Sequence, residues 1–274
     1  MFDFFGVLIP FLLIHIICDF YLQPNRWVEA KKAHTYRSPE LYFHAALQGI
    51  GLLLPAMALG IDWRSTVCLI VIVAVSHFII DLWKVTTPKG DKLAYFVIDQ
   101  ALHVSVLVAI AFHVADGASI DAVLQHERFS DGVLVVFAYL LILKPTSIVI
   151  GAVLNKYPIV NSAMDTDTDA VTDTDVVADP VIDKTVNVSG LVAGGELIGY
   201  LERLLILTFT LVGSYAAVGF VLAAKSIFRF GELNQSADRS MTEYVLIGSL
   251  ISVVITTLIG ALVRQAKLDA SCRV

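Results

Sequence analysis

Residues 64–84 read RSTVCLIVIVAVSHFIIDLWK, a mostly apolar run that carries a histidine and an aspartate four positions apart near its end. A helix of this length can cross the hydrocarbon core of a bilayer, which needs about 20 residues. His77 and Asp81 would then lie on one face, one turn apart. Ionisable side chains at membrane depth are costly, and they mark candidate functional sites. The stretch therefore predicts a transmembrane helix with a polar site.

Composition extends this prediction to the whole chain. The 274 residues are 57% hydrophobic and 16% charged, whereas soluble domains carry roughly 25% charged residues. The net charge of -6 comes largely from one acidic segment, so it indicates no nucleic-acid partner. We expect an all-α integral membrane protein whose partners are membrane lipids.

Apolar runs of spanning length recur along the chain and predict a bundle of about seven transmembrane helices. The fifth run contains Lys144-Pro145, where proline should break the helix. The first two pairs of helices look like similar hairpins, because each has a histidine in both of its helices. The predicted spans are 4–22, 41–59, 64–84, 93–115, 132–154, 198–225 and 243–263.

Four regions follow from these spans. An Asp/Thr-rich segment between the fifth and sixth spans has little to bury, and it predicts a disordered tether. The regions are a two-hairpin unit at 1–116, the fifth span at 117–157, the acidic linker at 158–190 and a C-terminal membrane hairpin at 191–274.

Loop charges predict the orientation. The positive-inside rule assigns the first and third loops, which are both basic, to the cytoplasm. The N-terminus is then outside, and seven crossings put the C-terminus in the cytoplasm. Lys225 and Arg229 disagree, since seven crossings would put their loop outside. The basic residues of the first and third loops are Arg26, Lys31, Lys32, Arg37, Lys84, Lys89 and Lys92.

Histidine and aspartate recur at helical spacing in the first four spans. His15 and Asp19 repeat the spacing of His77 and Asp81. Asp99 and His103 have the same spacing in reverse order, as an antiparallel neighbouring helix would need in order to present the same groups. All of these residues fall toward the cytoplasmic face. The predicted metal ligands are His15, Asp19, His44, His77, Asp81 and His103, with Asp99 as a further ligand or the catalytic base.

Such a set exceeds the three or four ligands that one zinc ion needs. Either two metals share a carboxylate, or one metal leaves a carboxylate free as general base. Zinc is the first choice of metal, and iron or manganese are the alternatives.

Charged residues in the later spans predict a second feature. Glu202 and Arg203 are expected to form an internal ion pair at membrane depth. The cations of these spans could bind an anion, or their side chains could simply extend to the membrane surface. The residues predicted to bind an anion or a lipid headgroup are Lys144, Arg203, Lys225 and Arg229.

Short sequence blocks carry a family resemblance. They include His15-x-x-x-Asp19-Phe20-x-Leu22-Gln23, His77-Phe78-x-x-Asp81-x-x-Lys84, Asp99-Gln100-x-Leu102-His103, Gly199-Tyr200-Leu201-Glu202-Arg203 and Glu243-Tyr244-x-Leu246-Ile247-Gly248. Together they resemble DUF3307, a family of bacterial inner-membrane proteins of unknown function, over all of the chain except the acidic linker. The resemblance implies a multi-pass protein of the bacterial inner membrane and no particular activity. The His-x-x-x-Asp helices also resemble, more loosely, membrane-bound metal-dependent hydrolases.

Three functions are compatible with these features. The leading hypothesis is a membrane-embedded, metal-dependent hydrolase that acts on a membrane-associated or amphiphilic substrate from the cytoplasmic face. The alternatives are a transporter or channel for transition-metal ions or protons, and a membrane scaffold without catalysis. Clustering of the polar residues toward one face favours hydrolysis, because a transport pathway needs polar groups at both faces.

Overall fold

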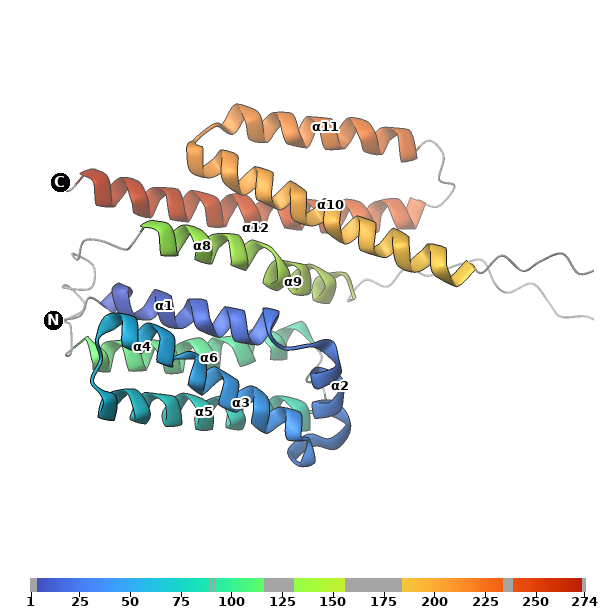
Figure 1. Ribbon diagram of the computed structural model, residues 1–274. Coiled ribbons are helices and arrows are strands. Elements are labelled where there is room, and N and C mark those ends of the chain that lie inside the picture. The colour runs from blue at the N-terminus through green and yellow to red at the C-terminus, as the bar shows by residue number, and fades with distance from the viewer. Residues whose placement is uncertain are drawn as a thin grey trace, which may run out of the picture.

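The computed structural model describes residues 4–88, 90, 92–115, 131–155, 184–233 and 239–272, and within these ranges all regular structure is helical. The helices lie side by side in a bundle (Figure 1). They are α1 (Phe4–Ile16), a π-helical turn η1 (Ile17–Tyr21), α2 (Asn25–His34), a 3-10 turn η2 (Thr35–Arg37), α3 (Pro39–Gly51), α4 (Leu53–Leu59), α5 (Trp63–Thr86), α6 (Leu93–Val114), α8 (Asp131–Ile142), α9 (Lys144–Leu154), α10 (Lys184–Val212), α11 (Tyr215–Leu233) and α12 (Arg239–Cys272).

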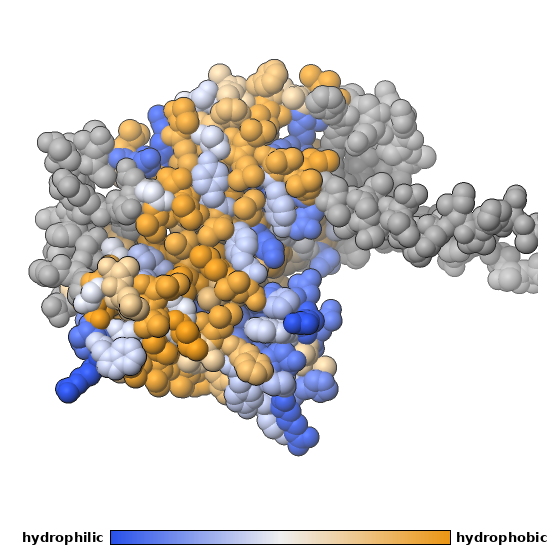
Figure 2. All heavy atoms as spheres, in the orientation of Figure 1, coloured by the Kyte–Doolittle hydropathy of each residue, from blue (hydrophilic) through white to orange (hydrophobic). Residues whose placement is uncertain are grey.

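Six segments among these residues are long and apolar enough to cross a membrane, as expected for an all-α membrane protein. Figure 2 shows apolar side chains over the middle of the visible face and hydrophilic ones gathered around the α2 end. The six segments are Phe4–Tyr21, Pro39–Leu59, Trp63–Thr86, Leu93–Val114, Gly132–Leu154 and Leu246–Leu268.

The first four spans pack as one bundle, with the short helix α2 at one end (Figure 1). At the opposite end apolar side chains form the interior, so the bundle is polarised along its length. Buried residues of this apolar core are Phe4, Val7, Leu8, Phe11, Leu52, Leu69, Val73, Leu107, Ile110, Ala111 and Ala115.

Two glycines of α3 allow its neighbours to approach closely. A Cβ atom on Gly49 would lie 2.7 Å from the carbonyl oxygen of Ile70, and one on Gly51 would lie 2.8 Å from Ile14 Cγ2. Small residues commonly permit such contacts between membrane helices. Gly49 therefore sets the short distance between α3 and α5, and Gly51 sets that between α3 and α1.

The start of α5 is fixed by a capping residue. The Asp62 carboxylate accepts a hydrogen bond from the backbone N–H of Ser65 at 2.9 Å. This hydrogen bond also holds the pKa of Asp62 below its usual value, because it favours the charged carboxylate. The cap fixes where α5 begins and hence the register of the histidine and the aspartate it carries.

The fifth span is broken at Leu143, two residues before Pro145. Leu143, with φ -81° and ψ -101°, separates α8 from α9. The Tyr21 hydroxyl enters the break, where it donates to the carbonyl of Leu140 at 2.7 Å and lies 3.5 Å from the backbone nitrogen of Lys144. Backbone groups freed by a break at membrane depth need such partners. Tyr21 thereby attaches the fifth span to the first.

The predicted sixth span, 198–225, is not a single helix. Gly213 has φ +82° and ends α10, and α11 runs back antiparallel to it (Figure 1). Glycine at such a left-handed position is a common helix terminator. The apolar run continues through the turn at Gly213-Ser214, so hydropathy alone merges two helices into one.

This turn changes the expected topology. It lies at the end of the bundle opposite α2, where Arg264 near the end of α12 donates to the Tyr215 hydroxyl at 3.0 Å. The end of α11 at Leu233 therefore lies toward the α2 end of the bundle. In Figure 1 α1 begins and α12 ends at the same end of the bundle, whereas the predicted orientation puts the N-terminus outside and the C-terminus in the cytoplasm; that orientation stays a prediction.

The predicted acidic linker, 158–190, lies outside the described residues as far as residue 183. Its last part is helical, since α10 already begins at Lys184.

Candidate metal centre

Polar side chains from the first four spans meet inside the bundle on the α2 side of the apolar core. The π-helical turn η1 contributes an aspartate, and α1, α3, α5 and α6 contribute histidines and two further aspartates. All of these side chains are buried except that of Asp19, which is 11% exposed. The structure brings together His15, Asp19, His44, His77, Asp81, Asp99 and His103.

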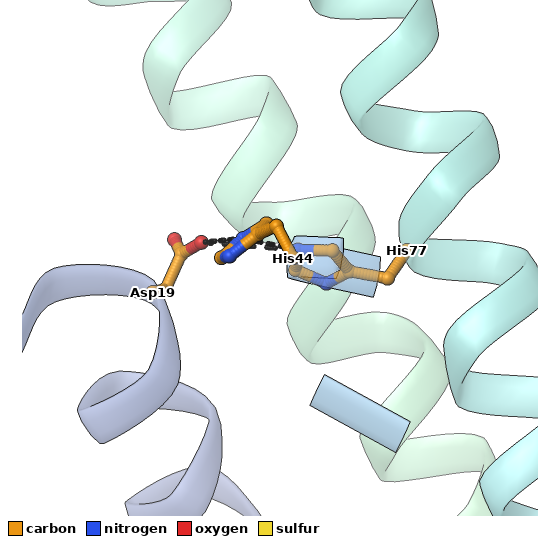
Figure 3. A group of neighbouring side chains, drawn as sticks. All are labelled: Asp19, His44 and His77. Atoms are coloured by element: carbon orange, nitrogen blue, oxygen red, sulfur yellow. Dashed lines mark hydrogen bonds and ion pairs between the residues drawn. The ribbon is translucent and has the colours of Figure 1, made fainter. Parts of the chain in front are cut away.

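Asp19, His44 and His77 form the tightest group (Figure 3). His44 Nε2 lies 3.1 Å from Asp19 Oδ1 and 2.9 Å from His77 Nε2, and the distance from His77 Nε2 to Asp19 Oδ1 is 3.8 Å. Ligand atoms around a tetrahedral zinc ion, with bonds of about 2.0 Å, lie about 3.3 Å apart. The three distances bracket this value, so the group fits a metal ion with three protein ligands.

Asp81 lies on the other side of the two imidazoles. Its Oδ2 is 3.8 Å from His44 Nε2 and 3.9 Å from His77 Nε2. The same oxygen accepts a 2.6 Å hydrogen bond from the ammonium of Lys31, which is 4% exposed. Lys31 reaches inward from α2, so this helix closes the α2 end of the cluster.

His103 is prepared to act as a ligand. Its Nδ1 lies 2.9 Å from the backbone carbonyl oxygen of Asp99, which favours a proton on Nδ1 and a free lone pair on Nε2. Nε2 is buried and has no hydrogen-bond partner. The ring centroids of His103 and His77 lie 4.0 Å apart with the ring planes tilted by 37°. His77, Asp81 and His103 form a second group with metal-binding spacing. A cavity of about 10 Å³ adjoins His77 and His103, roughly the space that one water molecule needs.

Both groups contain His77, which bears on the number of metals. A neutral imidazole has one lone pair, so its Nε2 can bind one ion. Simultaneous occupation of both groups through this atom is excluded. The geometry therefore favours one metal over the two-metal alternative.

The His15–Asp19 pair does not have the geometry expected for an α-helix. The backbone changes to π-helix after Ile16, so residues four apart no longer lie directly above one another. Asp19 turns to His44, whereas His15 Nε2 lies 3.4 Å from Gln100 Oε1. π-turns are frequent at functional sites, and this one presents Asp19 to the helix opposite.

Asp99 is part of neither three-residue group. Its Oδ2 accepts hydrogen bonds from Lys84 at 2.6 Å and from Gln100 at 3.2 Å, and its buried Oδ1 has no hydrogen-bond partner. Gln100 also donates to Asp19 at 2.8 Å. The Asp99 carboxylate thus binds a lysine and a glutamine, and its backbone carbonyl contacts His103.

A pocket of about 300 Å³ adjoins the cluster at its α2 end. Asp19 and Asp81 line it, so the carboxylate side of the metal-binding group faces open space. Three lysines and several apolar side chains form the walls: Lys31, Lys32, Lys84, Phe20, Val28, Val85, Phe96, Ile148 and Ala152.

The predicted ion pair between Glu202 and Arg203 is not formed. Adjacent residues of a helix point to different faces, and Glu202 pairs with Lys225 of α11 instead. Arg203 is 3% exposed and donates to Ser147 Oγ at 2.7 Å and to the Gly199 carbonyl at 3.0 Å. These contacts connect α10 to α9 and α11.

The predicted anion-binding residues are not gathered in one place. Lys144 lies over the ring of Tyr21, with its Nζ 5.5 Å from the ring centroid, and Lys225 is engaged by Glu202. Arg203 keeps one buried nitrogen, Nη1, without a partner. The side chain of Arg229 lies outside the described residues.

Several residues of the cluster have no metal-ligating side chain, and sequence reasoning missed them. Lys31 was interpreted only as a signal for orientation. Gln48, four residues after His44, is buried and lies 3.5 Å from the His15 carbonyl. That repeat of the four-residue spacing is a signal that could have identified Gln48, and Gln100 directly follows Asp99 in the sequence. His34 and His113, by contrast, are exposed.

Comparison with known proteins identifies a family. Residues 7–129 match the model of a family described as Protein of unknown function (DUF3307). No curated protein and no solved structure matches the chain. The match contains the whole His/Asp cluster together with Lys31 and Lys84, but not the C-terminal blocks that resemble the family. The N-terminal part of the chain is therefore similar to DUF3307, and that description names no activity.

Proposed function

We propose that the DUF3307-like part of this chain is a membrane-embedded, metal-dependent hydrolase for an amphiphilic substrate. The observation that carries the proposal is the Asp19–His44–His77 group, whose carboxylate side faces a pocket with both apolar and cationic walls. Three protein ligands with an open fourth position are typical of catalytic zinc sites, whereas structural sites are closed by four.

The chain's residues would divide the work as follows. Asp19, His44 and His77 hold the ion, with zinc as first choice and iron or manganese as alternatives. The bound metal would supply a Lewis acid and lower the pKa of a coordinated water. Asp81 lies beside both imidazoles and lines the pocket, so we assign it the role of base. Asp99, suggested by the sequence as ligand or base, orients Lys84 and Gln100.

Hydrolysis requires only these groups and water. The oxygen of water forms a bond to the electrophilic atom of the substrate, and Asp81 accepts the proton. The bond to the leaving group breaks, and the leaving group departs with a proton, for which the Lys84 ammonium in the pocket wall is a donor.

The packing of the first four spans favours hydrolysis over transport. A transport pathway needs polar groups or water through the full thickness of the membrane. Beyond His15 and His103, the described interior of these helices is the apolar core around Phe11, Val73 and Leu107. An ion that reached the cluster from the α2 end would meet this core before the opposite face.

Basic residues also suggest which way the site faces. Lys31, Lys32 and Arg37 lie on or next to α2, at the same end as the pocket. The positive-inside rule assigns this end to the cytoplasm. We therefore propose that the site opens to the cytoplasmic face of a bacterial inner membrane.

Metal content tests the proposal. The full chain, purified in detergent without chelators, is expected to carry close to one equivalent of transition metal by elemental analysis. His77→Ala should lose most of it, because His77 belongs to both candidate groups. His113→Ala is the matched control, since His113 lies on the same bundle but at the opposite end, exposed.

Asp19→Asn provides a second, milder test, because it keeps the size of the side chain and removes its charge. Circular dichroism and size-exclusion chromatography check that each variant is folded. Wild-type protein without metal, or His77→Ala that is folded and retains full metal, would contradict the assignment. If the metal-loaded protein hydrolyses no ester, the assignment of the metal centre stands and the proposed hydrolase function is wrong.

A further inference from the structure

We propose that the pocket beside Asp19 and Asp81 binds a phosphate monoester carried on an apolar chain. This inference rests on the proposed hydrolase and names its substrate class. It is drawn from the charges and the walls of the pocket, which the metal-binding residues alone do not determine.

Three lysines line the pocket at the carboxylate side of the cluster. Lys31 and Lys84 are held there by ion pairs of 2.6 Å with Asp81 and Asp99, and Lys32 lines the same pocket. The lysines come from two different helices, α2 and α5, so they converge on the pocket from separate sides. Lysine is a common point-charge partner for phosphate.

The charge balance favours a dianion. Lys31 is paired with Asp81 and Lys84 with Asp99, which leaves the negative charge of Asp19. A divalent metal bound at Asp19 would turn this into an excess positive charge, and Lys32 in the pocket wall adds to the positive potential there. A phosphate monoester carries about -1.5 to -2 at neutral pH, whereas a phosphodiester or a carboxylate carries one negative charge. The monoester therefore matches the metal-loaded pocket best.

The walls accommodate an apolar chain. Phe20 and Phe96 lie on the pocket with their rings 6.3 Å apart, and Ile148 and Ala152 of α9 complete the apolar side. Burial of a hydrocarbon chain against such a wall is favourable in proportion to the area removed from water. One pocket thus combines cationic and apolar walls, as an amphiphile with a phosphate head requires.

In the reaction, the oxygen of water bonds to phosphorus and the P–O bond to the alkyl group breaks. Asp81 accepts a proton from the water, and the leaving alkoxide takes one from Lys84. The products are an alcohol and inorganic phosphate, and no oxidant or further reactant is consumed.

Dodecyl phosphate is the probe for the test, with didodecyl phosphate and p-nitrophenyl dodecanoate as matched diester and carboxyl-ester controls. The metal-loaded full chain should release inorganic phosphate from dodecyl phosphate at least tenfold faster than it hydrolyses either control. Butyl phosphate should react at least tenfold more slowly in kcat/KM, because it cannot fill the apolar wall.

Lys32→Met tests the cationic wall without removing a partner of Asp81 or Asp99. It should raise KM for dodecyl phosphate about tenfold and leave the metal content unchanged. Arg64→Met, an exposed cation at the start of α5 and far from the pocket along that helix, is the control and should leave KM unchanged.

The outcomes separate the two proposals. If the protein hydrolyses the carboxyl ester but not dodecyl phosphate, the proposed substrate class is wrong and the proposed hydrolase function stands. Hydrolysis of none of the probes by metal-loaded protein overturns both. An unchanged KM in Lys32→Met overturns the role given to the lysines.

Discussion

Lys31 places a positive charge in the interior of the bundle, where it is paired with Asp81 and nearly inaccessible. Removal of one partner of a buried ion pair typically costs about 3–5 kcal/mol, since the other charge stays buried without compensation. Lys31→Met should therefore lower the unfolding free energy of metal-free protein by about this amount. A thermal or denaturant melt followed by circular dichroism measures it.

Lys32→Met is the matched control for stability, because Lys32 is the next residue of α2 and is exposed. Its effect should not exceed about 1 kcal/mol, the usual limit for surface pairs. A divalent metal near Asp81 would replace the missing ammonium, so added metal should stabilise Lys31→Met more than wild type. Equal stabilisation of both proteins would show that the ion does not reach Asp81.

At the residue scale, the four-residue spacing predicted part of the cluster. His77 and Asp81 lie on one face of α5 as expected, because that helix is regular through both residues. Asp19 could not be assigned a partner from sequence, since the π-helical turn rotates it toward His44. The sequence also did not predict that Lys31 points into the bundle, because a basic residue next to a membrane span is usually exposed to solvent.

Gly49 determines how closely two helices of the site approach each other. In Gly49→Ala the new Cβ would meet the backbone oxygen of Ile70 at 2.7 Å and the Cβ of Ala74 at 2.9 Å, so α3 and α5 must separate. Overpacking of this kind costs about 1–3 kcal/mol. Separation would also lengthen the 2.9 Å distance between His44 and His77, and metal affinity should fall at least tenfold by competition with a chelator.

Gly219→Ala in α11 is the control, because no atom lies within 4 Å of the added methyl group. It should leave metal affinity unchanged and alter stability by at most about 1 kcal/mol, in the stabilising direction. If Gly49→Ala retained wild-type metal affinity, the close approach of α3 and α5 would not be needed for binding.

At the element scale, apolar run length predicted which segments are helical better than it predicted where helices break. Pro145 gave a chemical reason for a break and one occurs two residues before it. Gly213 gave a weaker reason to expect a break, because glycines within membrane helices usually allow close packing between helices. Gly213 has φ +82°, and a Cβ atom there would lie 2.7 Å from Nη2 of Arg264 in α12; such an approach between residues far apart in the sequence is not visible in a local pattern.

On the scale of the whole molecule, the α10–α11 turn removes a conflict between charge and topology. A single span over 198–225 would put Lys225 on the outer side, against the positive-inside rule. With two antiparallel helices, Lys225 lies midway along α11, where its ammonium pairs with Glu202, and α11 runs back toward the α2 end. A helical hairpin is therefore compatible with the positive-inside rule, and the orientation stays a prediction.

Cysteine labelling tests this arrangement in intact cells. In a cysteine-free background, Ser214→Cys lies in the α10–α11 turn and Arg64→Cys at the start of α5, both at the end opposite α2. If that end faces outward, both should react with a membrane-impermeant thiol reagent. Lys32→Cys in α2 should be protected until the cells are permeabilised, because the basic α2 end is expected to face the cytoplasm.

Reaction at position 64 with protection at 214 would mean that α10 and α11 do not cross the membrane. Reaction at position 32 with protection at 64 would mean that the site faces outward, and its substrate would then have to be sought on the outer surface.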